Sequence, residues 1–369
     1  MLLRQPVVGH VKRRPYAQEE LNELHCDSLT GIVLQASSGF FEVETAHGTI
    51  LCVARSQVQV AQTQPPSDST QKKAKHRKGK RSKSQAVLDG NPNSYSCAAS
   101  GGNSMPRPVG GIVLGDKVAV TLTPDGRGVI EEVMPRTTQF SRKVAGKRRD
   151  EQVIAANLDQ VVVVLAAAEP PMKETSINRY LAVAEYCGLA AVICINKADL
   201  VSAEALEERM SVYRDIGYEV IIASTVSGTG ISDLRHILSG KMSALVGPSG
   251  VGKSSLISAV EPNADLEVGK ISESTGKGRH TTTSGRLIRL EGGGYVADTP
   301  GMREFGFYRI PGEDLAWCFR EFRPHIEECR FRDCTHTGEP GCGLQEAVEQ
   351  GLVSKGRYEH YVRLREEMR

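Results

Sequence analysis

The chain has 369 residues, enough for two or three domains that each bury a hydrophobic core. Its 46 basic and 44 acidic side chains nearly cancel, so the net charge of +2 favours no class of partner. No apolar run approaches the roughly 18 residues of a membrane helix. The N-terminus lacks the apolar core of a signal peptide. We therefore expect a cytoplasmic protein that does not associate with a membrane.

Short strands are predicted after a polar segment, residues 1–25, that we expect to be a flexible extension. Runs rich in β-branched and aromatic residues, separated by Gly, Ser and His-Gly, predict a small β-barrel over residues 26–140. The runs are Gly31–Gln35, Phe40–Glu44, Thr49–Val53, Val109–Val113, Asp116–Val120 and Gly128–Val133. We favour an OB-fold, although an SH3-like barrel would show the same pattern.

A polar insert, residues 61–108, interrupts the predicted barrel. It is rich in Ser, Pro, Gly, Gln and Asn and has almost no apolar periodicity, so we expect it to be disordered. Within it, residues 72–83 are strongly basic and contain no acidic residue. This run is either a solvated loop or a non-specific contact with a phosphate backbone, and beside such a barrel we favour RNA.

An α/β pattern over residues 153–309 follows a basic linker, residues 141–152. Apolar strands alternate with helical segments, which predicts a doubly wound sheet whose ligands bind at the carboxyl ends of the strands. The expected strands are Val161–Leu165, Ala190–Ile195, Tyr218–Ala223, Met242–Val246 and Tyr295–Asp298. The expected helices are 176–186, 202–216, 231–239 and 256–260.

A glycine-rich stretch between a strand and a helix has the P-loop spacing G-x-x-x-x-G-K-S. Its glycines let backbone N–H groups face phosphate oxygens, and the following helix N-terminus favours negative charge. We expect Lys253 to reach the β- and γ-phosphates and Ser254 to ligate Mg²⁺. The residues are Gly247, Pro248, Ser249, Gly250, Val251, Gly252, Lys253, Ser254 and Ser255.

Asn196, Lys197, Ala198 and Asp199 follow a predicted buried strand and indicate guanine as the base. The Asp199 carboxylate can accept two hydrogen bonds from the N1–H and N2–H₂ edge of guanine, which adenine lacks. Asn196 can hold the loop and the base, and the Lys197 stem can cover the ring. Alternatively, the turn merely caps the helix that starts near Ser202.

Further along the chain, a strand ends in Asp298-Thr299-Pro300-Gly301. We expect Asp298 to hold Mg²⁺ through water and the Gly301 N–H to meet the γ-phosphate. The Gly278–Thr283 segment offers hydroxyl groups, Thr282 among them, as Mg²⁺ ligands.

The order of these motifs is unusual for a GTPase. The guanine-reading residues, Asn196–Asp199 with Ser224 and Thr225, precede the P-loop, and Asp298–Gly301 comes last. In ordinary GTPases the P-loop comes first. Because the termini of compact domains often lie close together, a circular permutation can keep the same sheet.

The last expected domain, residues 310–369, contains Cys329, Cys334, His336 and Cys342. The pattern C-x₄-C-x-H-x₅-C predicts one closed tetrahedral Zn²⁺ site with a structural role. Core cysteines with an unrelated histidine are the alternative. Two helices, Leu344–Glu349 and Tyr358–Met368, follow in a domain small enough to need the metal.

These motifs together resemble the circularly permuted GTPases of small ribosomal subunit biogenesis, the RsgA family. The resemblance extends to Ala155–Gln160 and to the barrel, and it omits residues 1–25 and 61–108. It implies an OB-fold, a permuted GTPase domain and a zinc domain. It further implies a monomer that binds the 30S subunit and its 16S rRNA, hydrolyses GTP to GDP with stimulation by the subunit, and assists late maturation.

One departure from ordinary GTPases concerns the attacking water. Met302 stands where many GTPases have a glutamine, and a thioether cannot orient water. We therefore expect His280 or a partner to orient the attacking water. Lys253 and Thr282 are the other expected catalytic residues. Two alternatives remain open: a P-loop nucleotide kinase of the guanylate-kinase type, and a GTP-gated RNA-binding module whose hydrolysis is incidental.

Overall fold

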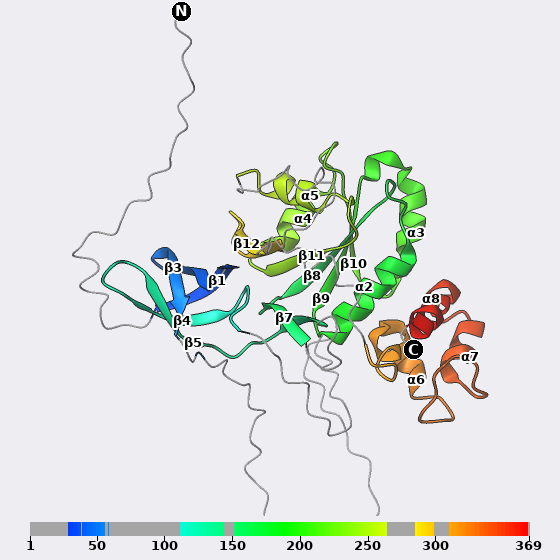
Figure 1. The fold of residues 1–369 in the computed structure, drawn as a ribbon. Coiled ribbons are helices and arrows are strands. Elements are labelled where there is room, and N and C mark those ends of the chain that lie inside the picture. The colour runs from blue at the N-terminus through cyan, green and yellow to red at the C-terminus, as the bar shows by residue number, and fades with distance from the viewer. Residues whose placement is uncertain are drawn as a thin grey trace, which may run out of the picture.

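The computed structural model describes residues 29–37, 39–55, 58, 111–143, 151–263, 285–298 and 310–367. Figure 1 shows three units: a β-barrel (blue to cyan), a central sheet with helices, and a C-terminal helical unit (orange to red) that lies beside α2 (Glu174–Tyr186). The extension expected at 1–25 and the insert expected at 61–108 lie outside the described residues. Among the described helices, none has the length and hydropathy to cross a membrane.

The N-terminal unit is a closed five-stranded barrel with OB-fold connectivity. Its strand order is β1-β2-β3-β5-β4, and β4 pairs back with β1 to close the barrel. The strands are β1 (Leu29–Ser37), β2 (Phe40–Thr45), β3 (Gly48–Ala54), β4 (Lys117–Leu122) and β5 (Gly128–Val133). Alternate residues point inward and form the core, as the period of a β-strand requires; examples are Val33, Val43, Ile50, Val118 and Ile130.

The run at Val109–Val113, expected as a strand, is not one in its described part. Residues 111–113 lie outside any strand, and the Val113 N–H donates instead to Oδ2 of Asp116 at 2.8 Å. The Asp116 carboxylate is fully buried and binds Arg136 Nε at 2.7 Å. This buried ion pair fixes a turn where the apolar pattern alone predicts a strand, because the charged groups must be satisfied inside the protein.

The residues expected as a linker, 141–152, are strand where the structure describes them. They belong to an antiparallel pair, β6 (Gln139–Lys143) with β7 (Glu151–Ala156). The pair forms because Phe140, Val153 and Ala155 bury their side chains against the central sheet. Asn157, just after β7, donates from Nδ2 to the Gly115 carbonyl at 2.8 Å and thereby ties the barrel to the sheet.

The central sheet has the order β10-β9-β8-β11-β13-β12, and every neighbouring pair is parallel except β12 with β13. The P-loop strand β11 is therefore central although three strands of the sheet precede it in the chain, which is the permuted arrangement predicted from the motif order. At one edge, β12 also pairs with β1 of the barrel through Gln35 and Arg286. The strands are β8 (Gln160–Ala166), β9 (Ala190–Asn196), β10 (Glu219–Ile222), β11 (Met242–Val246), β12 (Arg286–Arg289) and β13 (Tyr295–Asp298).

Helices cover both faces of this sheet. One hydrophobic cluster contains the inner faces of α2 and α3, and a second contains those of α4 and α5. β8 is buried along its whole length, as expected for a strand covered on both sides. The further elements are α3 (Ala203–Asp215), α4 (Ile231–Leu238), α5 (Lys253–Val260) and the short 3₁₀ helix η1 (Ala198–Leu200).

The C-terminal unit packs on the α2–α3 face, and its core is continuous with that face. Phe319, Phe322 and Tyr361 form an aromatic centre with ring centroids 4.7–5.6 Å apart. The two helices expected here are present as α7 and α8; the short turns before them had no clear periodic signal. The elements are η3 (Ala316–Cys318), η4 (Arg320–Phe322), α6 (Arg323–Ile326), α7 (Gly343–Glu349) and α8 (Lys355–Glu367).

Buried polar side chains also join the C-terminal unit to the central domain. Oδ1 of Asn178 on α2 accepts hydrogen bonds from Nη1 of Arg357 at 2.6 Å and from the Tyr213 hydroxyl at 3.0 Å. Arg357, which is buried, also binds Glu321 at 2.7 Å. Since removing one member would leave other buried groups without a partner, the network fixes how α8 lies on α2 and α3.

The same network predicts a pH dependence of stability. Nδ1 of His360 lies against Nδ2 of Asn178, which can only donate, so the ring is neutral in this contact. Desolvation lowers the pKa of His360, Arg363 and Arg357 lower it further, and Glu174 and Glu359 oppose them. Because the pKa of His360 in the folded protein lies below its usual value of about 6.5, the neutral ring contributes to the free energy of unfolding above that pH. This contribution is lost as the pH falls.

We therefore expect the free energy of unfolding to fall more steeply from pH 7.5 to 5.5 in the wild type than in His360→Gln. Urea denaturation at several pH values would measure both slopes. The comparison removes the contribution of every other titrating group because those groups are the same in both proteins. Equal slopes would contradict a role for His360.

Candidate nucleotide site and candidate metal site

The carboxyl ends of β8, β9, β11 and β13 meet at one edge of the sheet because these strands are parallel neighbours. The residues predicted to read the base, Asn196–Asp199, begin at the last residue of β9 and are called the base-reading loop here. The P-loop follows β11. Asp298 is the last residue of β13, where Ala297 pairs with Ala244 of the P-loop strand, and it is exposed. The fold thus brings together three motifs that the chain separates by up to about 100 residues.

The P-loop backbone has the form that phosphate binding requires. Gly247 and Gly252 have φ of 146° and 91°, and an added Cβ would lie 2.0 Å from the Val164 oxygen and 2.3 Å from Asn196 Nδ2 respectively. Only glycine fits these two positions. Ser249 and Gly250 form an exposed tip, and α5 begins at Lys253. The loop is therefore a backbone cradle at a helix N-terminus.

Lys253 lies over this cradle. Its ammonium donates to the carbonyl oxygens of Gly247 and Pro248, both at 2.7 Å. The charge is thus already placed on the loop that would hold a phosphate group. Ser254, in the first turn of α5, is exposed.

Asn196 links the base-reading loop to the P-loop. The side chain is buried at the end of β9, and Nδ2 donates to the Val251 carbonyl at 2.9 Å. Within the described residues, its Oδ1 is buried and has no hydrogen-bond partner. A buried acceptor without a partner is costly, so this atom favours a ligand that brings a donor.

Asp199 is tied to the loop after β10. Ser224, fully buried, donates from Oγ to Oδ1 of Asp199 and accepts from the N–H groups of Val226 and Ser227 at 3.2 Å. Thr225 follows as a half-buried residue, and the Ala198 N–H donates to Ala223 at 3.0 Å. Asp199 as a whole is an exposed residue, although its contact with Ser224 is partly buried.

The alternative of a simple helix cap does not describe this turn. The N-cap of α3 is Ser202, whose hydroxyl accepts from Ala205 N–H at 3.3 Å. Asp199 therefore does not cap α3.

Ser254 and Asp298 are the described candidates for Mg²⁺, and an exposed hydroxyl and carboxylate are suitable ligands for that ion. His280, Thr282 and Gly301 lie outside the described residues. Their roles remain expectations from the sequence.

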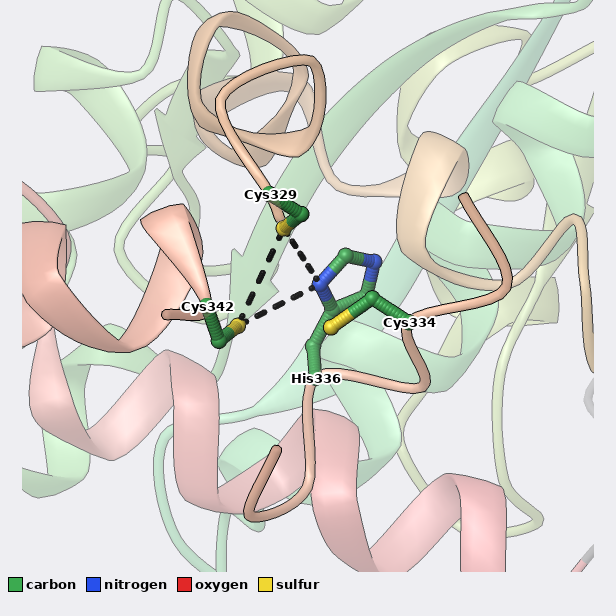
Figure 2. A group of neighbouring side chains, drawn as sticks. All are labelled: Cys329, Cys334, His336 and Cys342. Atoms are coloured by element: carbon green, nitrogen blue, oxygen red, sulfur yellow. Dashed lines mark hydrogen bonds between the residues drawn. The ribbon is translucent and has the colours of Figure 1, made fainter. Parts of the chain in front are cut away.

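The four predicted metal ligands of the C-terminal unit converge on one point (Figure 2). The ligand atoms of Cys329, Cys334, His336 and Cys342 all lie within 4.8 Å of one another. Nδ1 of His336 is 3.4 Å from Cys329 Sγ and 3.5 Å from Cys342 Sγ, and these sulfur atoms are 3.9 Å apart. A tetrahedral Zn²⁺ with Zn–S bonds of about 2.3 Å requires sulfur atoms about 3.8 Å apart, so the group fits zinc.

In the absence of a metal, these thiols are held in the protonated form. Burial raises the pKa of the Cys334 thiol to about 12 and raises that of Cys342. Desolvation lowers the pKa of His336, so its imidazole is neutral and can coordinate. A bound cation would instead stabilise these groups as thiolates, the form that coordinates zinc.

Three residues that the sequence analysis did not single out hold the ligand loop in place. The hydroxyls of Tyr358 and Tyr361 on α8 donate to the carbonyls of His336 and Thr335, both at 2.8 Å. Burial of the Glu339 carboxylate opposes its ionisation, but hydrogen bonds from Thr335 and Thr337 outweigh it and lower its pKa to about 2. The only signal in the sequence is the polar turn Thr335–Gly341 between the ligands.

Comparisons with known proteins agree with this architecture. A family model described as RsgA GTPase matches residues 133–308. A Gemmatimonas aurantiaca protein named small ribosomal subunit biogenesis GTPase RsgA is 46% identical over 261 residues, covering 70% of this chain and 84% of the relative. A protein of the same name from Shewanella oneidensis is 39% identical over 267 residues, covering 70% and 75%.

Two solved structures are similar over most of the chain. YjeQ from Thermotoga maritima superposes with a TM-score of 0.65 and 30% identity, covering 93% of this chain and 99% of that one. YloQ, described as a circularly permuted GTPase, gives a TM-score of 0.64 and 25% identity, covering 93% and 96%. The similarity thus spans all three units and includes the permuted order.

Proposed function

This chain belongs to the RsgA family of GTPases, and from that premise we propose that it hydrolyses GTP to GDP and phosphate while it assists late maturation of the small (30S) ribosomal subunit. One observation carries the proposal: the permuted chain brings Asn196–Asp199, Gly247–Ser255 and Asp298 to a single edge of the sheet. The relatives are named small ribosomal subunit biogenesis GTPases, which supports the small subunit as the partner.

Each part of the site has a separate task in this proposal. Asp199, held by Ser224, accepts from the guanine edge, and the P-loop backbone surrounds the phosphates. When GTP binds, the Lys253 ammonium gives up its hydrogen bonds to two P-loop carbonyls and donates to phosphate oxygens instead. This interaction becomes stronger as negative charge develops on those oxygens in the transition state. Mg²⁺, held by Ser254, Thr282 and Asp298, would neutralise phosphate charge when bound.

The attacking water needs a group that Met302 does not supply, and we propose His280 for that role on the subunit. GTP hydrolysis by the full chain should be slow alone and much faster with 30S subunits. His280→Ala should lose most of that stimulation and keep its affinity for GTP, because a group that orients the attacking water acts in the transition state and adds little to ground-state binding. Turnover measured with and without subunits tests both statements.

Three results would contradict parts of this proposal. Full stimulation in His280→Ala would remove the histidine from the mechanism. Equal turnover with and without subunits would favour a GTP-gated binding module, and phosphate transfer to GMP would favour a kinase.

We further propose that the chain contacts 16S rRNA, in part through the basic insert at residues 61–108. Each Lys or Arg that neutralises a phosphate makes binding more salt-dependent, with a slope of nearly one per contact. Deleting residues 66–104 should therefore flatten the plot of log affinity for 30S subunits against log salt. An unchanged slope would reduce the insert to a spacer.

We propose one structural Zn²⁺ at the C-terminal cluster, bound Mg²⁺ with the nucleotide, and a monomer in the cytoplasm. The convergence of four ligand atoms supports the zinc. Metal analysis and light scattering of the purified full chain would test the stoichiometry and the monomer.

A further inference from the structure

The turn that follows β8, residues 167–171, lies between the two loops of the proposed nucleotide site. β8 has β9 on one side and β11 on the other, so its carboxyl end opens between the base-reading loop and the P-loop. The Ala167 N–H donates to the carbonyl of Asn196 at 2.8 Å, which fixes the start of the turn to the end of β9. A Cβ on Gly250 would lie 3.8 Å from Cδ of Pro170, so the other side of the turn reaches the P-loop tip.

The backbone of this turn has an unusual conformation. Glu169 has φ of 53°, and Lys197 in the neighbouring base-reading loop has φ of 58°. Residues other than glycine rarely adopt this left-handed region, and they keep it only where surrounding contacts hold them. Here the Lys197 ammonium donates a hydrogen bond to the carbonyl oxygen of Glu169, so the two residues hold one another.

We propose that Glu169 is a positioning residue for the guanine nucleotide: its main-chain carbonyl anchors the Lys197 ammonium and so keeps the Lys197 stem over the face of the base. This rests on the proposed function, because it requires guanine to lie against Asn196–Asp199. A lysine side chain has four rotatable bonds, and anchoring its end before binding reduces the conformational entropy lost when the base arrives. The carboxylate of Glu169 has no part in this role.

Two substitutions at Glu169 separate the carbonyl from the carboxylate. Glu169→Asn removes the original side chain and keeps the left-handed backbone, which Asn tolerates. Glu169→Val is β-branched and forces the backbone out of that region, which moves the carbonyl. We expect GDP affinity within about twofold of wild type for Glu169→Asn, and about tenfold weaker for Glu169→Val and for Lys197→Met, the size of one hydrogen bond to a charged group.

A double-mutant cycle tests whether the two residues act through one contact. In the Lys197→Met protein, Glu169→Val should weaken GDP binding no further, because the contact is already absent. Calorimetry on the full chain would give the four affinities, and thermal unfolding would confirm that each variant is folded. Should Glu169→Val not fold, Glu169→Thr replaces it, since threonine is also β-branched and disfavours the left-handed region, while its hydroxyl suits this exposed position.

The outcomes separate this inference from the function on which it rests. Additive losses in the cycle, or an equal loss in Glu169→Asn and Glu169→Val, would overturn the role of the Glu169 carbonyl. A wild-type chain that does not bind GDP would instead overturn the proposed nucleotide site itself.

Discussion

Asp199→Asn is expected to change the preferred base from guanine to xanthine. The carboxylate accepts from two donors of guanine, and each hydrogen bond to a charged group contributes roughly 1.5–3 kcal/mol, so affinity for GDP should fall about 100-fold or more. The new amide can donate to the C2 oxygen of xanthine, so XDP should become the better ligand. The Ser224 hydroxyl can still donate to the amide oxygen at position 199, which keeps the two loops joined.

The measurement is the ratio of the affinities for GDP and XDP in each protein. Asp233→Asn, an exposed position in the first turn of α4, makes the same change of charge elsewhere and should leave the ratio unchanged. A variant at position 199 that keeps the wild-type preference for GDP would show that another residue reads the base.

Cys334→Ser is expected to remove the metal and to loosen the C-terminal unit. A serine hydroxyl is a poor substitute for a thiolate, and the three remaining ligands would leave an open site. Metal content should fall from about one Zn²⁺ per chain to near zero. The stability of the C-terminal unit should fall on the order of 5 kcal/mol, a fraction of the roughly 10–16 kcal/mol that structural zinc contributes in zinc-finger peptides.

GDP affinity should change only a few-fold in this variant. The C-terminal unit shares its core with α2 and α3, whereas Val251 and α5 pack in the cluster on the other face of the sheet. Cys187→Ser, outside the ligand cluster, is the matched control for loss of a thiol. One equivalent of zinc retained in Cys334→Ser would show that Cys334 is not a ligand, and a large loss of GDP affinity would show that the two faces are coupled.

The apolar pattern predicts most of the barrel but fails where charged or basic segments are buried. Alternation of apolar residues predicted five barrel strands, because the period of two is set locally by the backbone. The same signal failed at Val109–Val113, where the buried pair of Asp116 and Arg136 holds the chain in a turn. It also missed β6 with β7, since a basic composition conceals the buried Phe140 and Val153.

The sequence by itself determined the chemistry of the two sites. In the P-loop, the base-reading loop and the Cys/His cluster, the grouped residues lie within about fourteen residues of one another, so spacing alone predicts a ligand for each. The order of the base-reading loop, the P-loop and Asp298 also predicted the permutation, since each of the three lies at the end of a strand of one sheet.

Only the tertiary structure decided how those motifs are held. Asn196 with Val251, Lys197 with Glu169, and Asn178 with Arg357 join residues 55, 28 and 179 positions apart. No local pattern marks such pairs, because an isolated polar residue in sequence shows neither its burial nor its partner. The packing of strands and helices brings these residues together. A polar group buried by that packing needs a hydrogen-bond partner, because burying it without one costs free energy.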